Sequence, residues 1–200
     1  MFVAAIPIIY IVLLYLCLLI SFFRRKRDES YIFVYFVIVA VIETVTHFFT
    51  VEINHIYTAG SFFYIGYFTY YYAKQIEQRR KLIYSLGVLA AVISVIFILF
   101  SKYSFSVALG VTVAVFYITL ALFWLFDQIQ NVQKVYILKK QAFWVSTALI
   151  FWSIIFLFRI TLMHWLEAND YAFLVVLDHI FKVSVVLTYV FFLIAVTRKY

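Results

Sequence analysis

Hydrophobic residues occur along this chain in seven long runs, separated by short segments where the charges gather. A helix needs about 20 apolar residues to cross the hydrocarbon core of a bilayer, and these runs are of that length. None alternates steadily between apolar and polar positions, so the pattern favours helices rather than the strands of a barrel. The predicted helices cover residues 2–23, 31–51, 57–73, 82–100, 105–126, 141–163 and 171–196.

Composition agrees with this pattern. Of the 200 residues, 68% are hydrophobic and 12% are charged, whereas soluble proteins average about 45–50% apolar and about 25% charged residues. A disordered chain is excluded by the same figures, and a disulfide scaffold is excluded by the single cysteine, Cys17. Because the connections are short, we expect one domain over residues 1–200: an all-α membrane protein folded as a monomeric seven-transmembrane-helix bundle.

The positive charges predict an orientation. Nearly all Lys and Arg residues lie in the first, third and fifth connections and in the C-terminal tail, while the even connections contain only Lys102. Short cytoplasmic loops carry this excess, so we expect the N-terminus outside and the C-terminus in the cytoplasm of a bacterial inner membrane or a plasma membrane. The net charge of +7 suits an anionic inner leaflet. Basic residues scattered over separate short loops do not favour a nucleic-acid partner.

Four ionisable residues fall inside the predicted helices and form the candidate polar or ligand site. They are Glu43 and His47 in the second helix, and Asp178 and Lys182 in the seventh. Each such residue costs about 2.5–3.5 kcal/mol on insertion scales, so each needs a partner or a role. Both pairs have i,i+4 spacing, which places their members on one helix face. A structural ion-pair network and a functional polar site are both open interpretations.

Depth along the helices predicts that Glu43 and Asp178 lie level with each other, with Lys182 one turn deeper. The charges of these three residues sum to minus one. We therefore expect either one protonated carboxylate or a positive charge from His47 or His179.

Arg159 and a row of tyrosines are secondary candidates. Arg159 is predicted about 6 Å from the outer end of the sixth helix, from where it can extend outward to meet Glu167 or Asp170. The third helix carries Tyr64, Tyr67 and Tyr71 on one stripe. Such a stripe is compatible with ordinary aromatic packing or with an aromatic ligand wall.

The Asp178-x-x-x-Lys182 motif, in a seventh helix with the N-terminus outside, resembles microbial rhodopsins. That resemblance implies retinal as a cofactor, with Lys182 as the Schiff-base lysine and Asp178 in its counterion. The remaining motifs of that family are missing, because the third helix has no charge and the tryptophans of the sixth, Trp144 and Trp152, stand without its proline.

Glu43-x-x-x-His47 resembles one part of the seven-helix zinc hydrolases of the alkaline ceramidase and progestin-receptor type. The seventh helix lacks their paired histidines, and a catalytic zinc needs three protein ligands. Other signatures of intramembrane enzymes, such as HExxH and GxSxG, are missing from the sequence. We therefore expect neither a metal nor an enzyme activity.

Over most of its length the chain resembles uncharacterised small bacterial seven-helix proteins that are often encoded near sensor kinases. The resemblance rests on Glu43, on Asn54-His55-Ile56-Tyr57 with Phe63-Tyr64, on Phe143-Trp144 and on residues 189–199. It implies a sensor, a receptor-like protein or an accessory to a signalling partner, with the segment 127–140 as the candidate partner surface. A small transporter is a further alternative, but the chain shows no internal repeat and no Gly/Pro-broken helices.

Overall fold

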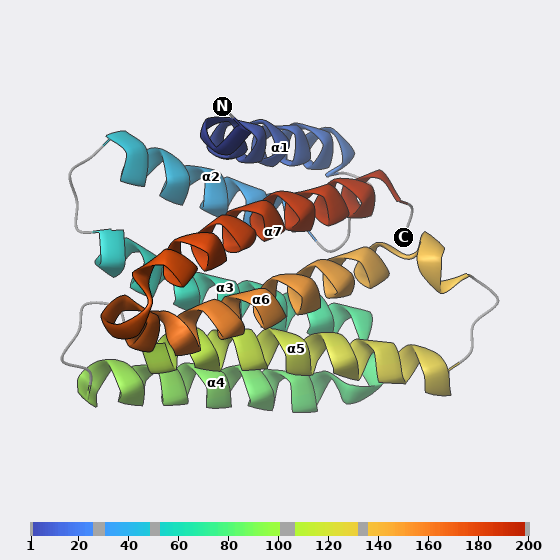
Figure 1. Ribbon diagram of the computed structural model, residues 1–200. Coiled ribbons are helices and arrows are strands. Elements are labelled where there is room, and N and C mark those ends of the chain that lie inside the picture. Colours follow the sequence, from blue (N-terminus) through green and yellow to red (C-terminus); the bar gives the residue numbers. More distant parts are fainter. Residues whose placement is uncertain (1, 26–30, 49–52, 101–106, 132–135, 199–200) are drawn as a thin grey trace.

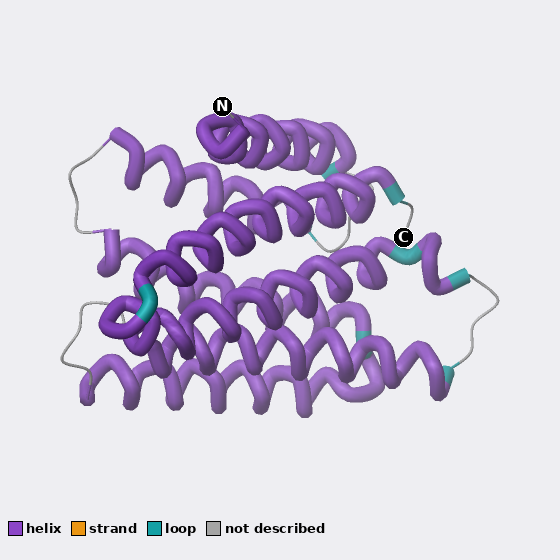
Figure 2. The backbone as a smooth tube through the Cα atoms, in the orientation of Figure 1, coloured by secondary structure: helices purple, strands orange, loops and turns teal. Residues whose placement is uncertain are grey.

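The computed structural model describes residues 2–25, 31–48, 53–100, 107–131 and 136–198, and these form helices with no strand among them (Figure 2). The described α-helices, shown in Figure 1, are α1 (Phe2–Arg24), α2 (Ile32–Phe48), α3 (Ile53–Gln75), α4 (Arg80–Phe100), α5 (Val107–Gln130), α6 (Gln141–Asn169) and α7 (Tyr171–Thr197). Two 3-10 helices, η1 (Glu77–Arg79) and η2 (Ile137–Lys139), precede α4 and α6.

Successive helices run antiparallel and close into a ring (Figure 1). Each helix packs on the next along the chain, and α1 packs on α7. One contact departs from the simple ring, because α3 also packs directly on α5 and leaves α4 outside both of them. We call the end of the bundle where α6 meets α7 the Asn169 end, and the opposite end, where α6 begins, the Gln141 end.

Five of the described helical stretches are long and apolar enough to cross a membrane: Ile6–Arg24, Glu77–Phe100, Val107–Gln130, Gln141–Asn169 and Tyr171–Thr197. A shorter apolar stretch, Ile32–Thr46, lies in α2. Helix α3 is long enough, with 23 residues, but its tyrosines lower its hydropathy. Apolar side chains cover the outside of the bundle, as at Val88, which is 64% exposed. Lipid is the medium that makes such a surface favourable.

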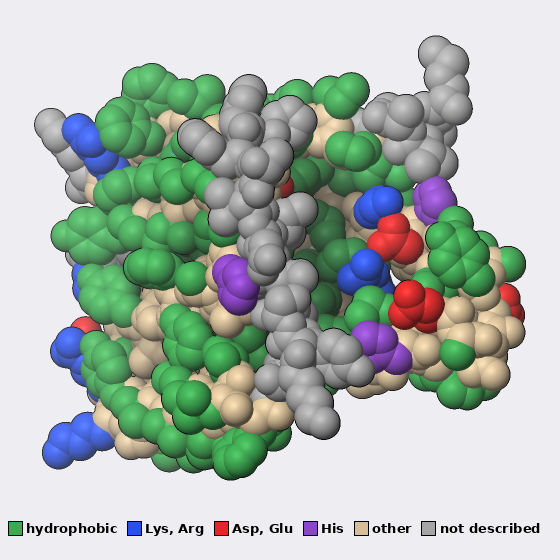
Figure 3. Space-filling model, turned by 90° about the vertical axis from the view of Figure 1, so that its left-hand side faces the viewer, with side chains coloured by type: hydrophobic (Ala, Val, Ile, Leu, Met, Phe, Trp, Pro, Cys, Tyr) green, Lys and Arg blue, Asp and Glu red, His purple; other side chains and the backbone are tan. Residues whose placement is uncertain are grey.

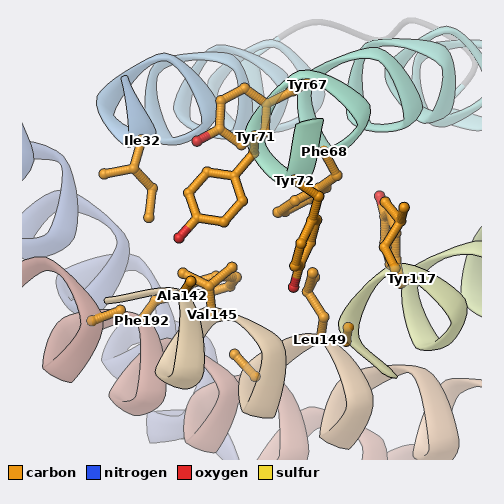
Figure 4. Close-up of a cluster of buried hydrophobic side chains, with 14 of the residues drawn as sticks. Ile32, Tyr67, Phe68, Tyr71, Tyr72, Tyr117, Ala142, Val145, Leu149 and Phe192 are labelled. Atoms are coloured by element: carbon orange, nitrogen blue, oxygen red, sulfur yellow. The ribbon is translucent and has the colours of Figure 1, made fainter. Parts of the chain in front are cut away.

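Aromatic side chains fill the core towards the Gln141 end. Tyr71 and Tyr72 of α3 are fully buried and point from α3 towards α6 (Figure 4). The Tyr72 hydroxyl forms a 2.8 Å hydrogen bond with Ser146 of α6, so its polar atom has a partner inside the core. These residues explain why α3 tolerates many tyrosines, because much of the helix faces protein rather than lipid.

Three of the predicted helix bounds that fall on described residues differ from those of the described helices by more than two residues. Helix α6 continues to Asn169 instead of ending at residue 163, and α3 begins at Ile53 instead of residue 57. The residues at these ends are more polar than the apolar runs, but their backbone groups still form helical hydrogen bonds. The segment predicted as a loop over 127–140 is partly helical, because α5 extends to Gln130 and η2 covers Ile137–Lys139. Residues 49–51 and 105–106, predicted at helix ends, lie outside the described residues.

A single residue connects α6 to α7 at the Asn169 end. Asp170 ends α6 and caps α7, since its side chain accepts a 3.0 Å hydrogen bond from the backbone N–H of Phe173. Because the link is this short, the register between the two helices is fixed.

Polar side chains join the helices at the Gln141 end. Arg24 of α1 donates to the carbonyl oxygens of Val196 and Thr197 at the C-terminus of α7, at 3.0 and 2.7 Å. Arg79 donates to Gln130 at 2.7 Å. Lys140 donates to Gln128, and partial burial lowers the pKa of its ammonium group from the usual value.

Candidate ligand-binding cavity

A cavity of about 580 Å³ lies inside the helix ring. Side chains from α1, α2, α3, α5, α6 and α7 line it. Helix α4 contributes no described side chain, which follows from the direct packing of α3 on α5 in front of it. The volume falls in the range of about 300–1,000 Å³ that is usual for small-molecule sites.

More than half of the described lining residues are aromatic. Six of them are tyrosines, contributed by five helices: Tyr10, Tyr35, Tyr57, Tyr64, Tyr117 and Tyr189. Their rings pack on one another, as in the edge-to-face contact of Tyr10 with Tyr189 at 5.0 Å between centroids. Such walls combine a large apolar area with hydroxyl groups that can hydrogen-bond.

Flat aromatic surfaces form the wall beside α6 and α7. Trp152 and Phe156 of α6 stack at 4.5 Å between centroids with an interplanar angle of 11°. The ring centroid of Phe181 in α7 lies 5.9 Å from that of Phe156, and the ring centroid of Tyr117 in α5 lies 6.1 Å from that of Trp152. The i,i+4 spacing of Trp152 and Phe156 along α6 places both rings on the same face of that helix.

Two ionisable residues of opposite charge line the cavity, Glu43 and Arg159. Glu43 of α2 accepts a hydrogen bond from the Tyr10 hydroxyl of α1, with 3.0 Å between the oxygen atoms. An ionised carboxylate accepts such a bond more strongly than a neutral oxygen does. This contact fixes Glu43 on the side of the cavity formed by α1 and α2.

Arg159 belongs to an ion-pair triad with Asp178 and Lys182. Its Nη2 atom lies 2.9 Å from Asp178 Oδ1, and Lys182 Nζ lies 2.7 Å from Asp178 Oδ2. The side chains of Arg159 and Asp178 are 26% and 29% exposed. Acidic and basic side chains gather beside one another when the bundle is viewed from the Asn169 end, on the right-hand side in Figure 3.

The aromatic wall and the triad meet at Arg159. Its Cζ atom lies 4.9 Å from the centre of the Phe181 ring, a cation–π contact. Its Nε atom is buried and has no hydrogen-bond partner among the described residues. Asp178 and the Phe181 ring thus hold the guanidinium in place, while its buried Nε–H group has no acceptor among the described residues.

The predicted Arg159 contacts are wrong. Arg159 pairs with Asp178 and not with Glu167 or Asp170, because α6 continues to Asn169 and places Arg159 about 15 Å from that end rather than about 6 Å. The charge balance changes as a result. Arg159 supplies the balancing positive charge, in place of the expected protonated carboxylate or charged histidine.

The structure places three of the four predicted site residues in two different settings. The predicted pair Asp178/Lys182 is present in the structure, and Glu43 lines the cavity. Asp178 and Lys182 are not among the described lining residues. His47 lies in α2, but its side chain falls outside the described residues. His179 Nδ1 lies 2.6 Å from the Val175 carbonyl oxygen, one turn back along its own helix.

The tyrosine stripe of α3 divides between the cavity and the core. Tyr64 lines the cavity, whereas Tyr67 and Tyr71 are buried at 8% and 0% exposure in the aromatic core. Ordinary aromatic packing therefore accounts for Tyr67 and Tyr71, and a ligand wall stays a prediction for Tyr64. Tyr67 stacks on Tyr35 of α2, with 5.7 Å between ring centroids, and Tyr35 itself lines the cavity.

The sequence alone did not identify Tyr10 as the partner of Glu43, and it indicated Arg159 only as a secondary candidate for the polar site. Tyr10 stands in a strongly apolar run, where nothing marks a tyrosine as a hydrogen-bond donor to a carboxylate. A signal for Arg159 was present, because Trp152, Phe156 and Arg159 fall on one helical face at spacings of four and three residues.

The apolar helices and the ring around this cavity define a multi-pass helical membrane protein. No family model, curated protein or solved structure matches the chain. Within the described residues, no group of three or more His, Cys, Asp and Glu side chains could hold a metal ion.

Proposed function

We propose that this protein is a receptor-like membrane protein, without enzyme activity, that binds a small molecule in the cavity and acts through a signalling partner. The observation that carries the proposal is the cavity, which joins aromatic walls from six helices to one acidic and one basic side chain. Ligand sites are typically concave and mostly apolar, with a few placed polar groups that set orientation.

The proposed orientation puts the N-terminus outside and the C-terminus in the cytoplasm of a bacterial inner membrane or a plasma membrane. The distribution of Lys and Arg between odd and even connections supports it. The Asn169 end would then face outward and the Gln141 end would face the cytoplasm. Fusions at the C-terminus test this: a fluorescent protein should be bright there, and an active alkaline phosphatase fusion would contradict the orientation.

The Gln141 end is the proposed partner surface. The segment around η2 exposes Tyr136 and Leu138, which are 76% and 59% exposed. Basic residues Lys139 and Lys140 follow directly and suit an anionic leaflet or an acidic partner surface. The connections are too short to contain a signalling domain, so the output of a ligand-induced change would need a second protein.

Native mass spectrometry of the full-length protein in lipid nanodiscs tests ligand binding. We expect a small-molecule adduct on the wild-type protein. Val185→Phe should remove it by placing a larger ring in the ligand's space, because Val185 is a lining residue. Val183→Phe, on the exposed face of the same helix, is the matched control and should keep the adduct. An adduct that survives Val185→Phe, or no adduct in any preparation, would contradict the proposal.

Retinal receives less support from the site. The Lys182 amine is bonded to Asp178, its side chain is 48% exposed, and it is not a described lining residue of the cavity. A retinal Schiff base would require that nitrogen to face an enclosed chromophore site. Addition of retinal to the purified protein checks the point, since a visible absorption band that disappears in Lys182→Ala would restore the rhodopsin alternative.

A further inference from the structure

The triad on α6 and α7 carries more positive than negative charge. Asp178 uses both carboxylate oxygens, one for Arg159 at 2.9 Å and one for Lys182 at 2.7 Å. Two cations therefore share one anion, and the triad has a net charge of plus one. Glu43 is the acidic residue among the described lining residues; it accepts a hydrogen bond from Tyr10 and forms no ion pair with Arg159 among the described residues.

Only one member of the triad faces the cavity. Arg159 is the one basic residue among the described lining residues, whereas Lys182 and Asp178 are not part of the lining. The positive surplus of the triad is therefore presented to the cavity through the guanidinium of Arg159. A group that binds there meets a positive charge that the ion pairs of the described residues leave in excess.

The guanidinium also has an unused donor. Arg159 carries five N–H groups, and one nitrogen, Nη2, donates to Asp178. The buried Nε has no partner among the described residues. A buried donor without an acceptor costs about 1–3 kcal/mol, so an acceptor supplied by a ligand would be favourable. Planar carboxylates match the fork of Arg better than other anions of the same charge.

The walls next to Arg159 favour a ring. Phe181 lies under the guanidinium, and the Trp152–Phe156 stack continues the wall along α6. Flat side chains that already stack at 4.5 Å accept a further planar ring with little rearrangement. These aromatic residues and Arg159 belong to the lining of the same cavity, so one ligand could place a ring on the wall and an acid group on Arg159.

We infer that the cavity binds an aromatic carboxylic acid, with the carboxylate on Arg159 and the ring against Trp152, Phe156 and Phe181. The inference rests on the proposed receptor function and names the chemical class of its ligand. Lys182 has a positioning role in this arrangement. It keeps Asp178 neutralised when Arg159 shares its hydrogen bonds with a ligand, so the carboxylate of Asp178 is not left unpaired at membrane depth.

Three probes with the same ring and different charge test the inference: naphthylacetate, naphthylacetamide and naphthylethylamine. Isothermal titration calorimetry on the full-length protein in neutral-lipid nanodiscs gives each affinity. We expect the acid to bind at least about ten-fold more tightly than the amide, which corresponds to about 1.4 kcal/mol. The amine should bind more weakly than either.

Variants locate the contact. Arg159→Gln should lower the affinity for naphthylacetate to that for naphthylacetamide, and it should leave the affinity for naphthylacetamide nearly unchanged. Arg159→Lys keeps the charge and should therefore recover part of the preference for the acid over the amide. Lys182→Gln removes an equal charge outside the lining and should reduce the preference by less than Arg159→Gln does. Equal losses in these two variants would overturn the assignment of Arg159 as the contact.

The outcomes separate this inference from the proposed function. If the amide or the amine binds as tightly as the acid, the cavity is a ligand site and the acid class is wrong. If none of the probes binds, the aromatic acid is again excluded, and the adduct experiment with Val185→Phe still decides whether the cavity binds a small molecule. Calorimetry is interpreted only for variants that elute with the wild-type volume in size-exclusion chromatography.

Discussion

Arg159 Nη2 and Asp178 Oδ1 lie 2.9 Å apart, and this contact joins the two helices that Asp170 alone connects. The residues are 19 positions apart in the sequence, too far for a local helical pair. Lys182 bonds to the other carboxylate oxygen of Asp178. Asp178 is therefore the centre of the charge arrangement, and it is the residue whose loss leaves two cations without a partner.

Asp178→Asn should lower the free energy of unfolding by about 2 kcal/mol, because hydrogen bonds to charged groups are worth about 1.5–3 kcal/mol and the two cations would repel each other. Arg159→Gln should cost a similar amount. The double variant should cost less than the sum of the two, with a coupling of about 0.5–3 kcal/mol. Denaturation in mixed micelles measures all three, and additive losses would show that the pair does not interact.

Tyr10→Phe should destabilise the protein by about 1–2 kcal/mol. It removes the hydroxyl that donates to Glu43 at 3.0 Å and leaves the carboxylate facing an apolar ring. Tyr15→Phe is the matched control on the same helix, because the Tyr15 hydroxyl makes a 3.3 Å contact with Thr44 at an exposed position. Tyr15→Phe should change the free energy of unfolding by less than about 0.5 kcal/mol. Equal shifts of the apparent melting temperature for both variants would argue against a role for the Tyr10–Glu43 bond.

Gly87→Ala should destabilise the α3–α4 contact by about 1–3 kcal/mol. A Cβ atom at Gly87 would overlap Thr69 Oγ1 and would lie 2.6 Å from Thr69 Cγ2. Thr69 cannot move away easily, since it is buried and its hydroxyl donates to the Ile65 carbonyl oxygen at 2.6 Å. The two helices would have to separate.

Gly66→Ala supplies the control for that substitution. A Cβ atom at Gly66 would meet nothing within 4 Å, and the residue lies inside α3. Alanine should stabilise the helix by roughly 0.5–1 kcal/mol there. A destabilising Gly66→Ala would mean that the outer face of α3 contacts something other than lipid.

Arg24→Gln should destabilise the last helical turn of α7, so that this turn opens more often. The guanidinium donates to the carbonyl oxygens of Val196 and Thr197, which no longer have intrahelical partners at a helix C-terminus. A cation at this position is worth about 1 kcal/mol, so amide hydrogen exchange over residues 194–198 should rise roughly five-fold. Arg25→Gln, next in sequence, should leave that exchange unchanged, because Arg25 lies over the Phe22 ring instead.

The helices of this protein could be predicted from sequence because lipid imposes a simple rule. Long apolar runs must be helical, and those predicted at residues 82–100 and 171–196 lie within the observed α4 and α7. Helix ends were harder to predict, because a polar side chain leaves the hydrocarbon without breaking a helix. At the end of α6 it is the cap formed by Asp170, and not the change of polarity at residue 163, that stops the helix.

The candidate site was only partly predictable. Spacing along one helix identified the Asp178–Lys182 pair correctly, since residues four apart meet on one face. Contacts between helices depend on rotation and register, which apolar runs do not encode. This is why Arg159 was assigned to the wrong acids, and why Tyr10 could not be recognised as the partner of Glu43.

The one-residue link between α6 and α7 also bears on how the chain enters the membrane. A lone charge in a helix costs about 2.5–3.5 kcal/mol on insertion. Arg159, Asp178 and Lys182 all belong to one helical hairpin, so Asp178 can pair with both cations before the hairpin leaves the translocon. Biogenesis can then deliver three charges to lipid as a single paired unit, with no need for the other five α-helices to be in place first.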